Sequence, residues 1–574
     1  MRDPLLRMYN NALFVYKFVW TFEKKEEQII MPLVRKKDTR FTFISLACLL
    51  LLLLSACGGG NTGSTSNSET PAQKQVLRFP NVGTADIGKL DPASGPDSNS
   101  NLAINMIFSG LVRSDKDLNV VADQAESWKI SQDNKVYTFK LRPDVKFSDG
   151  TPVTAQSYVW TWTRALLPEV KSPVASVLME SIVGAQDVIS GKSKTLSGVK
   201  ALDEHTLQVS LVRPTAYFLQ LLTVSLFYPL NQQVIEKYGQ DRWSQNIANT
   251  GAGTGPFMVK SWEKGVKMVL VPNPHYYRTK TKLSEVDMFF IKDPATAFRS
   301  YQANQYDLIW NLIPADQETA KNLPGFVRKP ILQTDLLFFH NKMPPFDKSA
   351  VRQAFAAAID KEALAKNIFK DTVTVADTII PPGQPGAQTD YKGIPFNKQK
   401  ARQLLESVYP DVSKMPPVTF TYPGSQVPQD EASALQQMWK DALGVQVKLN
   451  PMELTTYNQE TSKRTVQFGF TQWGVYFPDP YEWLDLSLLS TSANNNGLWN
   501  NPEFDKTVAQ AENASGQDRL NLYSKAERIA IEDVGWLPLT HKSMTAVFSS
   551  KLHGVTLNSN GLYFGDWSEV YLTQ

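Results

Sequence analysis

The sequence has very few cysteines and histidines: two cysteines and five histidines in 574 residues. Cys48 lies inside an apolar run and Cys57 lies at its end, so the rest of the chain cannot form a disulfide within itself. No histidine lies within five residues of another, which excludes a local histidine metal motif such as H-E-x-x-H. Stability beyond Cys57 must therefore come from a packed core. The 42% hydrophobic content is sufficient for one.

Motifs for catalysis and for nucleotide binding are also missing. The sequence contains no G-x-x-x-x-G-K-[ST] phosphate loop and no G-x-S-x-G nucleophile elbow. Residues 251–255 read GAGTG, but Pro256 and a strand-like run follow, whereas a dinucleotide-binding loop is followed by a helix. We interpret this stretch as a turn that enters a strand. The sequence therefore predicts neither an enzyme nor a bound cofactor or metal.

The chain has no excess of one charge once its first 56 residues are set aside. Those residues hold nine Lys and Arg against five Asp and Glu, so removing them leaves 50 basic and 51 acidic residues. A nucleic-acid-binding surface is not indicated. The 518 residues from Cys57 onward are enough for two or three domains.

The N-terminal region has the layout of a secretory signal. Basic residues at 35–37 and at 40 precede an apolar run at 41–54, and Ser55, Ala56 and Cys57 follow. This end resembles the lipobox of bacterial lipoproteins, which implies that Cys57 carries a diacyl lipid and begins the mature chain. The alternative is an uncleaved signal anchor or a short membrane helix. The run of about 14 residues is shorter than the roughly 20 needed to cross a bilayer.

These features predict the organisation of the first 75 residues. Met31 is a normal start for such a signal, so we expect residues 1–30 to be an upstream extension and 31–56 to be the signal peptide. Residues 57–75 are rich in Gly, Ser, Thr and Asn and are expected to form a flexible tether. The protein is then expected on the extracellular face of the plasma membrane of a Gram-positive-type cell. In a cell with an outer membrane, the same signal would place it in the periplasm.

Strand and helix patterns alternate after the tether. Apolar alternation predicts strands at residues 136–142, 257–262, 267–272 and 286–291. Amphipathic spacing predicts helices at 349–359, at 397–408 with Asn397 as N-cap, and around 432–443, the last followed by a strand at 445–449. The chain is therefore expected to be α/β, with more than one core.

Several longer motifs occur in a fixed order along the chain. Residues 125–155 contain A-E-S-W, Y-T-F-K-L-R and F-S-D-G-T-P-V-T-A; G-P-F at 255–257 precedes N-P-H-Y-Y at 273–277; and residues 341–360 contain P-P-F-D and V-R-Q-A. Together they resemble the bacterial extracellular solute-binding proteins of family 5, the oligopeptide, dipeptide and nickel class. The resemblance covers about residues 76–574, and most of these motifs make sense as turns and caps rather than as ligand contacts.

This resemblance implies a two-lobed periplasmic-binding-protein-like fold of class II, cluster C type, with an extra subdomain in the first lobe. The first lobe is expected to comprise residues 76–113, 240–327 and 541–574, the extra subdomain 114–239, and the second lobe 328–540. It also implies a monomer whose lobes close around a ligand by hinge motion and which delivers that ligand to an ABC importer.

The family's ligand loop differs here at one important position. Peptide-binding members have W-x-x-D-Y-x-[DE]-P, in which the aspartate pairs with the peptide's α-amino group. This chain has Trp473, Tyr476 and Asp479 at the tryptophan, aspartate and acidic positions. A phenol cannot supply the charge that a buried ammonium needs. Trp473 and Tyr476 are our candidate pocket residues, with core packing as the alternative, and Asp479 is expected to cap the following turn or to contact ligand.

Two other segments are candidates for lining the cleft. Peptide binders resemble S-P-Y-A-S-Y where this chain has Val174 and Val177, so that side of the pocket is expected to be more apolar. Asn99 and Asn101 lie in a polar stretch before a helix that ends near Phe108. They either line the cleft from the first lobe or cap that helix.

Three functions remain open from the sequence. The first is an oligopeptide receptor whose peptide amine is anchored away from Tyr476. The second is a receptor of the same fold for another solute, such as an oligosaccharide that stacks on aromatic rings. The third is a secreted lipoprotein enzyme or an adhesin, which no motif supports.

Overall fold

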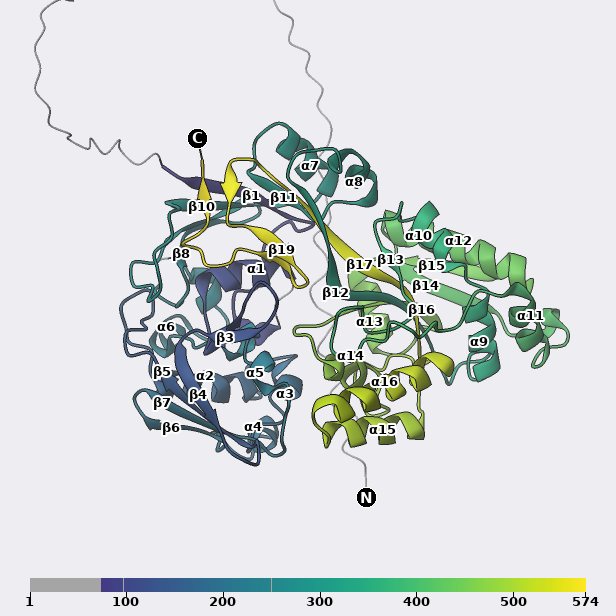
Figure 1. Ribbon diagram of the computed structural model, residues 1–574, viewed down its shortest axis with the longest axis horizontal. Helices are drawn as coiled ribbons and strands as arrows, with labels where there is room; N and C mark the ends of the chain where they lie inside the picture. The colour runs from purple at the N-terminus through teal and green to yellow at the C-terminus, as the bar shows by residue number, and fades with distance from the viewer. Residues whose placement is uncertain (1–73, 96–97, 249, 574) are drawn as a thin grey trace, which may run out of the picture. The chain divides into compact units, whose positions relative to one another are not determined.

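The computed structural model describes residues 74–95, 98–248 and 250–573 (Figure 1). The predicted signal peptide, Cys57 and nearly all of the predicted tether lie outside the described residues. The described chain mixes helices with parallel and antiparallel strands, which confirms the α/β prediction.

A four-stranded sheet, with strand order β1-β10-β9-β8, organises the first core. Strand β1 runs parallel to β10, and the other neighbours are antiparallel. Its strands are β1 (Val76–Val82), β8 (Phe257–Glu263), β9 (Lys267–Pro272) and β10 (Glu285–Ile291). Helices of this region are α1 (Ser98–Ile107), α6 (Gln232–Tyr238), α7 (Pro294–Gln302) and α8 (Pro314–Ala320). Short strand pairs complete it: β18 (Leu552–His553) with β21 (Tyr571–Leu572), and β19 (Thr556–Asn558) with β20 (Gly561–Tyr563). One buried cluster joins residues from 77–108, 228–312 and 546–570, so the C-terminal segment returns to the first core.

A second four-stranded sheet, with order β4-β5-β7-β6, forms the part that we call the extra subdomain. Its strands are β4 (Ala125–Ile130), β5 (Val136–Leu141), β6 (Val199–Asp203) and β7 (Thr206–Ser210). Its helices are α2 (Ala155–Leu166), α3 (Ala175–Leu178), α4 (Ala185–Ile189) and α5 (Phe218–Leu221), and the hairpin β2 (Val112–Ser114) and β3 (Val120–Ala122) precedes it. Its buried cluster is separate from that of the first sheet, and it also takes in Phe477 and Tyr481 from far along the chain.

A seven-stranded sheet, with order β11-β17-β12-β16-β14-β15 and β13 beside β17, organises the remainder. Its strands are β11 (Leu308–Trp310), β12 (Phe326–Phe339), β13 (Thr374–Val375), β14 (Val418–Pro423), β15 (Val447–Met452), β16 (Phe468–Gly474) and β17 (Trp536–Phe548). Strands β12 and β17 are long and run side by side (Figure 1). One end of the pair packs on the first core, through Val327 and Ala546, and the other end lies in the second lobe. These two strands are therefore the two crossovers between the lobes.

Helices cover both faces of this sheet because alternate strand residues point to opposite sides. Leu337 and Phe339 belong to one buried cluster, and Leu336 and Phe338 belong to another. The first face carries α9 (Ser349–Ala357), α11 (Lys398–Glu406) and α12 (Gln426–Leu443). The second face carries α14 (Pro480–Leu488), α15 (Pro502–Glu512) and α16 (Gly516–Glu532). Helices α10 (Lys361–Asn367) and α13 (Leu454–Ser462) complete this lobe.

The predicted elements are confirmed, with corrections at their ends. All four predicted strands form, and the side chain of Asn397 caps α11 by accepting the N–H of Lys400 at 2.9 Å. Helix α12 begins at Gln426, six residues before the predicted start, because its first turns are polar and its Pro428 is compatible with a helix N-terminus. The strand after it begins at Val447 rather than at residue 445.

Candidate ligand-binding site

The end of β16 and the loop that leads from it to α14 carry three of the candidate residues, Trp473, Tyr476 and Asp479. Trp473 is half-buried at the end of β16, opposite Thr334 of the crossover strand β12. Its indole N–H donates to the backbone carbonyl of Glu482 at 2.7 Å, and its ring lies 5.4 Å from that of Trp536. One side of Trp473 is thus packed as core, and the residue lies where the chain leaves β16, beside the crossover strand β12.

Tyr476 is the large hydrophobic side chain that this loop leaves exposed, at 42%. Its backbone N–H donates to Oε2 of Glu482 at 2.6 Å, which fixes the loop against α14. Burial and the nearby Glu482 both raise the pKa of its phenol. Tyr476 is thus exposed rather than packed in the core, and its role in the pocket stays a prediction.

Asp479 has the structural role that the sequence offered for it. Its side chain caps α14 by accepting the N–H of Tyr481 at 2.9 Å. Both carboxylate oxygens also accept from the guanidinium of Arg519 on α16, at 2.7 and 2.9 Å, and both side chains are buried. The cap prediction is confirmed, and the carboxylate is already paired within the protein.

Glu482 is a residue that the sequence analysis did not select. It lies in the first turn of α14 and is 2% exposed. Its Oε2 accepts from the loop backbone, and its Oε1 has no hydrogen-bond partner within the described ranges. Burial raises its pKa to about 8. An available signal was the pattern of residues 480–488, PYEWLDLSL, where acidic residues interrupt an otherwise apolar helix.

Aromatic rings join the extra subdomain to the N-terminal end of α14. The ring of Tyr217 stacks on Tyr481 with centroids 4.3 Å apart and on Phe477 at 5.6 Å. The hydroxyl of Tyr481 donates to Glu180 at 3.3 Å, and Arg213 bridges Glu180 and the Glu512 carboxylate of α15 at 3.2 and 2.9 Å. A hollow of only about 10 Å³ remains beside these residues, so the junction is closely packed.

The valines predicted to line the cleft lie near this junction. Val174 precedes α3 and Val177 lies within it, and Glu180 follows three residues later. Both valines are half-buried. A side chain at Gly95, just before α1, would clash with Pro173 and approach Val174, so the chain before α1 passes against this segment. The structure thus brings the α3 segment close to α14 and to the start of α1.

Asn99 and Asn101 lie inside α1, so neither is its N-cap, and the capping alternative is wrong. The backbone carbonyl of Asn99 accepts from the side chain of Asn81 at 3.1 Å, and the side-chain oxygen of Asn101 accepts from Ser225 at 3.0 Å. Asn101 therefore ties α1 to the segment that follows α5. Both residues remain predicted rather than tested ligand contacts.

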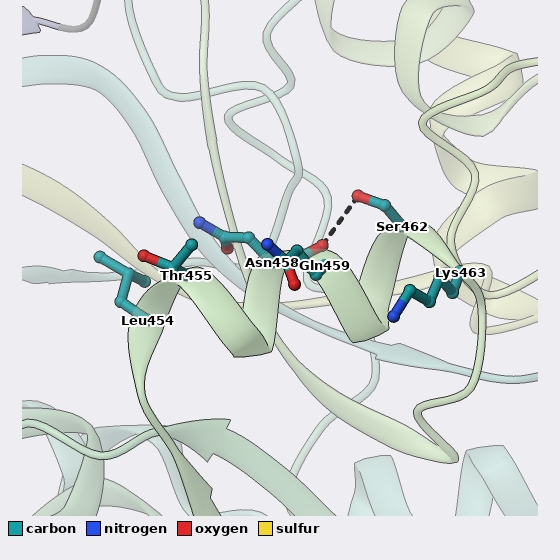
Figure 2. A pocket seen from close by; sticks show the side chains of 6 residues that line it. All are labelled: Leu454, Thr455, Asn458, Gln459, Ser462 and Lys463. Carbon is teal, nitrogen blue, oxygen red and sulfur yellow. Dashed lines mark hydrogen bonds between the residues drawn. The ribbon is translucent and has the colours of Figure 1, made fainter. Parts of the chain in front are cut away.

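A larger hollow of about 520 Å³ lies elsewhere, on α13 (Figure 2). All of its lining side chains come from this one helix and the residue after it: Leu454, Thr455, Asn458, Gln459, Ser462 and Lys463. A hollow lined by a single helix does not enclose a ligand on several sides, as binding sites do. It also contains none of the predicted site residues.

The described residues show neither a metal-binding group nor a membrane-spanning helix. Residues 74–95, 98–248 and 250–573 contain no group of three or more His, Cys, Asp or Glu side chains that could hold a metal ion. Within the same ranges, no helix combines the length and the apolar character needed to cross a membrane.

The fold and the loop together define a class: a two-lobed α/β binding protein with its candidate site on a loop beside the crossover strand β12. The chain belongs to the bacterial extracellular solute-binding proteins of family 5, whose middle region matches residues 119–495. The resemblance inferred from the motifs is confirmed, and so is the periplasmic-binding-protein-like fold. The chain is accordingly a solute-binding receptor and not an enzyme.

Individual relatives cover nearly the whole chain. An oligopeptide-binding protein, OppA of Bacillus subtilis, is 30% identical over 542 residues, which cover 92% of this chain and 98% of that protein. A probable deoxycholate-binding periplasmic protein of Escherichia coli, YgiS, is 31% identical over 507 residues and covers 86% of this chain and 93% of its own. The solved structure of Listeria monocytogenes OppA bound to peptide superposes with a TM-score of 0.74 at 27% identity, over 87% of this chain and 99% of that one.

Proposed function

We propose that this protein is an oligopeptide receptor that delivers its ligand to an ABC importer. The observation that carries this proposal is the near-complete match to relatives that are named as oligopeptide-binding proteins, one of which was solved with a bound peptide. The lobes close around the ligand through the crossover strands β12 and β17, which are the continuous links between the two cores. The Tyr217, Phe477 and Tyr481 contacts belong to the closed state, since they join segments of different lobes.

The proposal also includes an anchored receptor built from the predicted parts. Cys57 carries the lipid, residues 57–75 are the tether, and a monomeric receptor is held close to the importer on the extracellular face. The lobe boundaries proposed are 76–113, 240–327 and 541–574 for the first lobe, 114–239 for the extra subdomain and 328–540 for the second lobe. The separate buried clusters of the first sheet and of the extra subdomain support a division into these two parts, but they group residues 228–238 with the first sheet.

A second candidate is a receptor for a non-peptide solute, such as an oligosaccharide. Tyr476 favours it, because an exposed aromatic ring stands where peptide binders have an aspartate. One relative, 31% identical to this chain, is named as a probable deoxycholate-binding protein, and deoxycholate is not a peptide.

Ligand-induced thermal stabilisation separates the candidates. A ligand at about a hundred times its Kd stabilises the folded state by roughly 2.7 kcal/mol, which is a readily measured shift. The melting temperature is measured with a mixed peptide pool, with cello- and manno-oligosaccharides and with deoxycholate. A shift with the peptide pool supports the peptide receptor. A shift with another solute and none with peptides overturns it. Native mass spectrometry of the purified protein gives an independent reading from the mass of any retained ligand.

A further inference from the structure

The carboxyl group of Glu482 is buried without a cation. The side chain is 2% exposed, and the described residues provide no ion-pair partner for it. Its neighbour Asp479, also buried, is by contrast paired with Arg519 through two hydrogen bonds. The N-terminal end of α14 therefore holds two buried carboxyl groups but one buried cation.

The structural role of Glu482 does not require its charge. A capping-box glutamate would reach back to the N–H of the cap residue, here Asp479. The Oε2 of Glu482 instead accepts the N–H of Tyr476 at 2.6 Å, and the backbone of Phe477 also faces the carboxyl group. The amide oxygen of glutamine could accept from the same backbone. The other oxygen, Oε1, has no hydrogen-bond partner in the described chain. Buried polar atoms in folded proteins are nearly always paired, so an unpaired one calls for an explanation.

Glu482 also lies directly beneath the predicted ligand loop. Trp473 donates to its backbone carbonyl, and Tyr476 donates to its carboxylate. The Tyr476 N–H lies 2.6 Å from Oε2 of Glu482, so the base of the Tyr476 side chain is next to this carboxyl group, and Glu482 contributes to the raised pKa of the Tyr476 phenol. Tyr476 is 42% exposed, so its side chain is accessible from solvent at the loop that covers Glu482.

We propose that Glu482 binds a primary ammonium group of the ligand at its unpaired oxygen Oε1, with the ring of Tyr476 facing the same cation. An ammonium supplies both the positive charge and the hydrogen-bond donors that this carboxylate lacks. The aromatic face of Tyr476 adds a cation–π contact. This assignment rests on the proposed function as a peptide receptor, and the ammonium comes either from the peptide's N-terminus or from a lysine side chain.

The test compares Glu482→Gln with a matched control, Glu527→Gln. Glu527 is also fully buried, and it accepts the N–H of Ile380 at 2.7 Å and the side chain of Gln388 at 2.6 Å, outside the ligand loop. Binding is titrated with three tetrapeptide libraries: lysine-free with free N-termini, the same library N-acetylated, and an acetylated library with one lysine. The wild-type protein is expected to prefer an ammonium-bearing library at least tenfold over the acetylated lysine-free library.

The two variants then decide the role of the residue. Glu482→Gln is expected to remove the preference while retaining binding of the acetylated library, and Glu527→Gln is expected to retain the preference. Preference for free N-termini assigns the α-ammonium, and preference for the lysine library assigns the side chain. A tenfold preference that survives in Glu482→Gln overturns the proposal, as does a wild-type protein that binds all three libraries equally. A wild-type protein that binds none of them contradicts the peptide function itself. Retained binding of the acetylated library shows that Glu482→Gln is folded.

Discussion

The rings of Tyr217 and Tyr481 stack with centroids 4.3 Å apart and an interplanar angle of 20°, although the two residues are 264 positions apart in the chain. Tyr217 comes from the extra subdomain and Tyr481 from α14 of the second lobe. Both are buried, and Phe477 extends the stack on the loop side. The extra subdomain is thus a direct partner of the ligand loop and not only an appendage of the first lobe.

This stack gives a prediction about ligand affinity. In Tyr217→Leu the buried volume is largely kept but the ring contacts with Tyr481 and Phe477 are lost, and each aromatic pair contributes about 0.5–1.5 kcal/mol. If the contacts form only on closure, affinity should fall about tenfold, as measured by calorimetric titration of the peptide pool. The control is Glu512→Gln, which cuts a half-exposed ion pair to Arg213 and should change affinity by less than about fivefold. Unchanged affinity in Tyr217→Leu, with only a lower melting temperature, would mean that the contact is permanent.

The pair formed by Asp479 and Arg519 gives a prediction about stability. Asp479→Asn keeps the helix cap but leaves the buried guanidinium of Arg519 without its anion. Breaking a buried pair by removing one partner costs about 3–5 kcal/mol. Urea denaturation should show a loss of this size, and Asp479→Asn combined with Arg519→Met should recover part of it. A loss below about 1 kcal/mol in the single variant would show that the pair is not needed.

The sequence predicted the elements well where local patterns decide them. The strand at residues 267–272 and the Asn397 cap follow from alternation and from cap chemistry, both of which are local. The cap role of Asp479 was also visible, but its partner Arg519 lies 40 residues away on another helix. No spacing rule connects those positions, since tertiary packing brings α14 and α16 together.

Glu482 shows why the site could be predicted only in part. The family motif selected residues 473, 476 and 479, which lie at the end of β16 and on the loop that leads to α14. The importance of Glu482 depends on its burial and on the absence of a neighbouring cation among the described residues. Both properties arise from packing against distant segments, and neither can be read from a helix sequence.

Tyr476→Asp tests whether the amine lies at this loop. The substitution restores a carboxylate at an exposed position, and a charge-assisted hydrogen bond contributes about 1.5 kcal/mol, or roughly tenfold in affinity. Peptides with a free N-terminus should therefore bind about tenfold more tightly, while acetylated peptides should bind no better. The control is Tyr476→Asn, which has a similar size but no charge. Weaker or unchanged binding in Tyr476→Asp would place the amine elsewhere in the cleft.

Proton release on binding gives the last prediction. Burial raises the pKa of Glu482 to about 8, so at pH 6.5 the free protein holds this group mostly protonated. The charge of Asp479, which is itself paired with Arg519, also raises the pKa of Glu482. An ammonium bound at Oε1 favours the carboxylate and lowers that pKa, so up to one proton leaves for each ligand bound. The ligand's own ammonium is already charged at pH 6.5 and does not offset this release.

Calorimetry in two buffers of different ionisation enthalpy measures the protons released. At pH 6.5 the wild-type protein should release between about half a proton and one proton per ammonium-bearing peptide. Glu482→Gln should release none with the same peptide, and the wild-type protein should release none with the acetylated peptide. Raising the pH toward 9 should abolish the release in the wild-type protein, because the free carboxyl group is then already ionised. Equal release by the wild-type protein and Glu482→Gln would assign the proton to another group and remove Glu482 from the amine site.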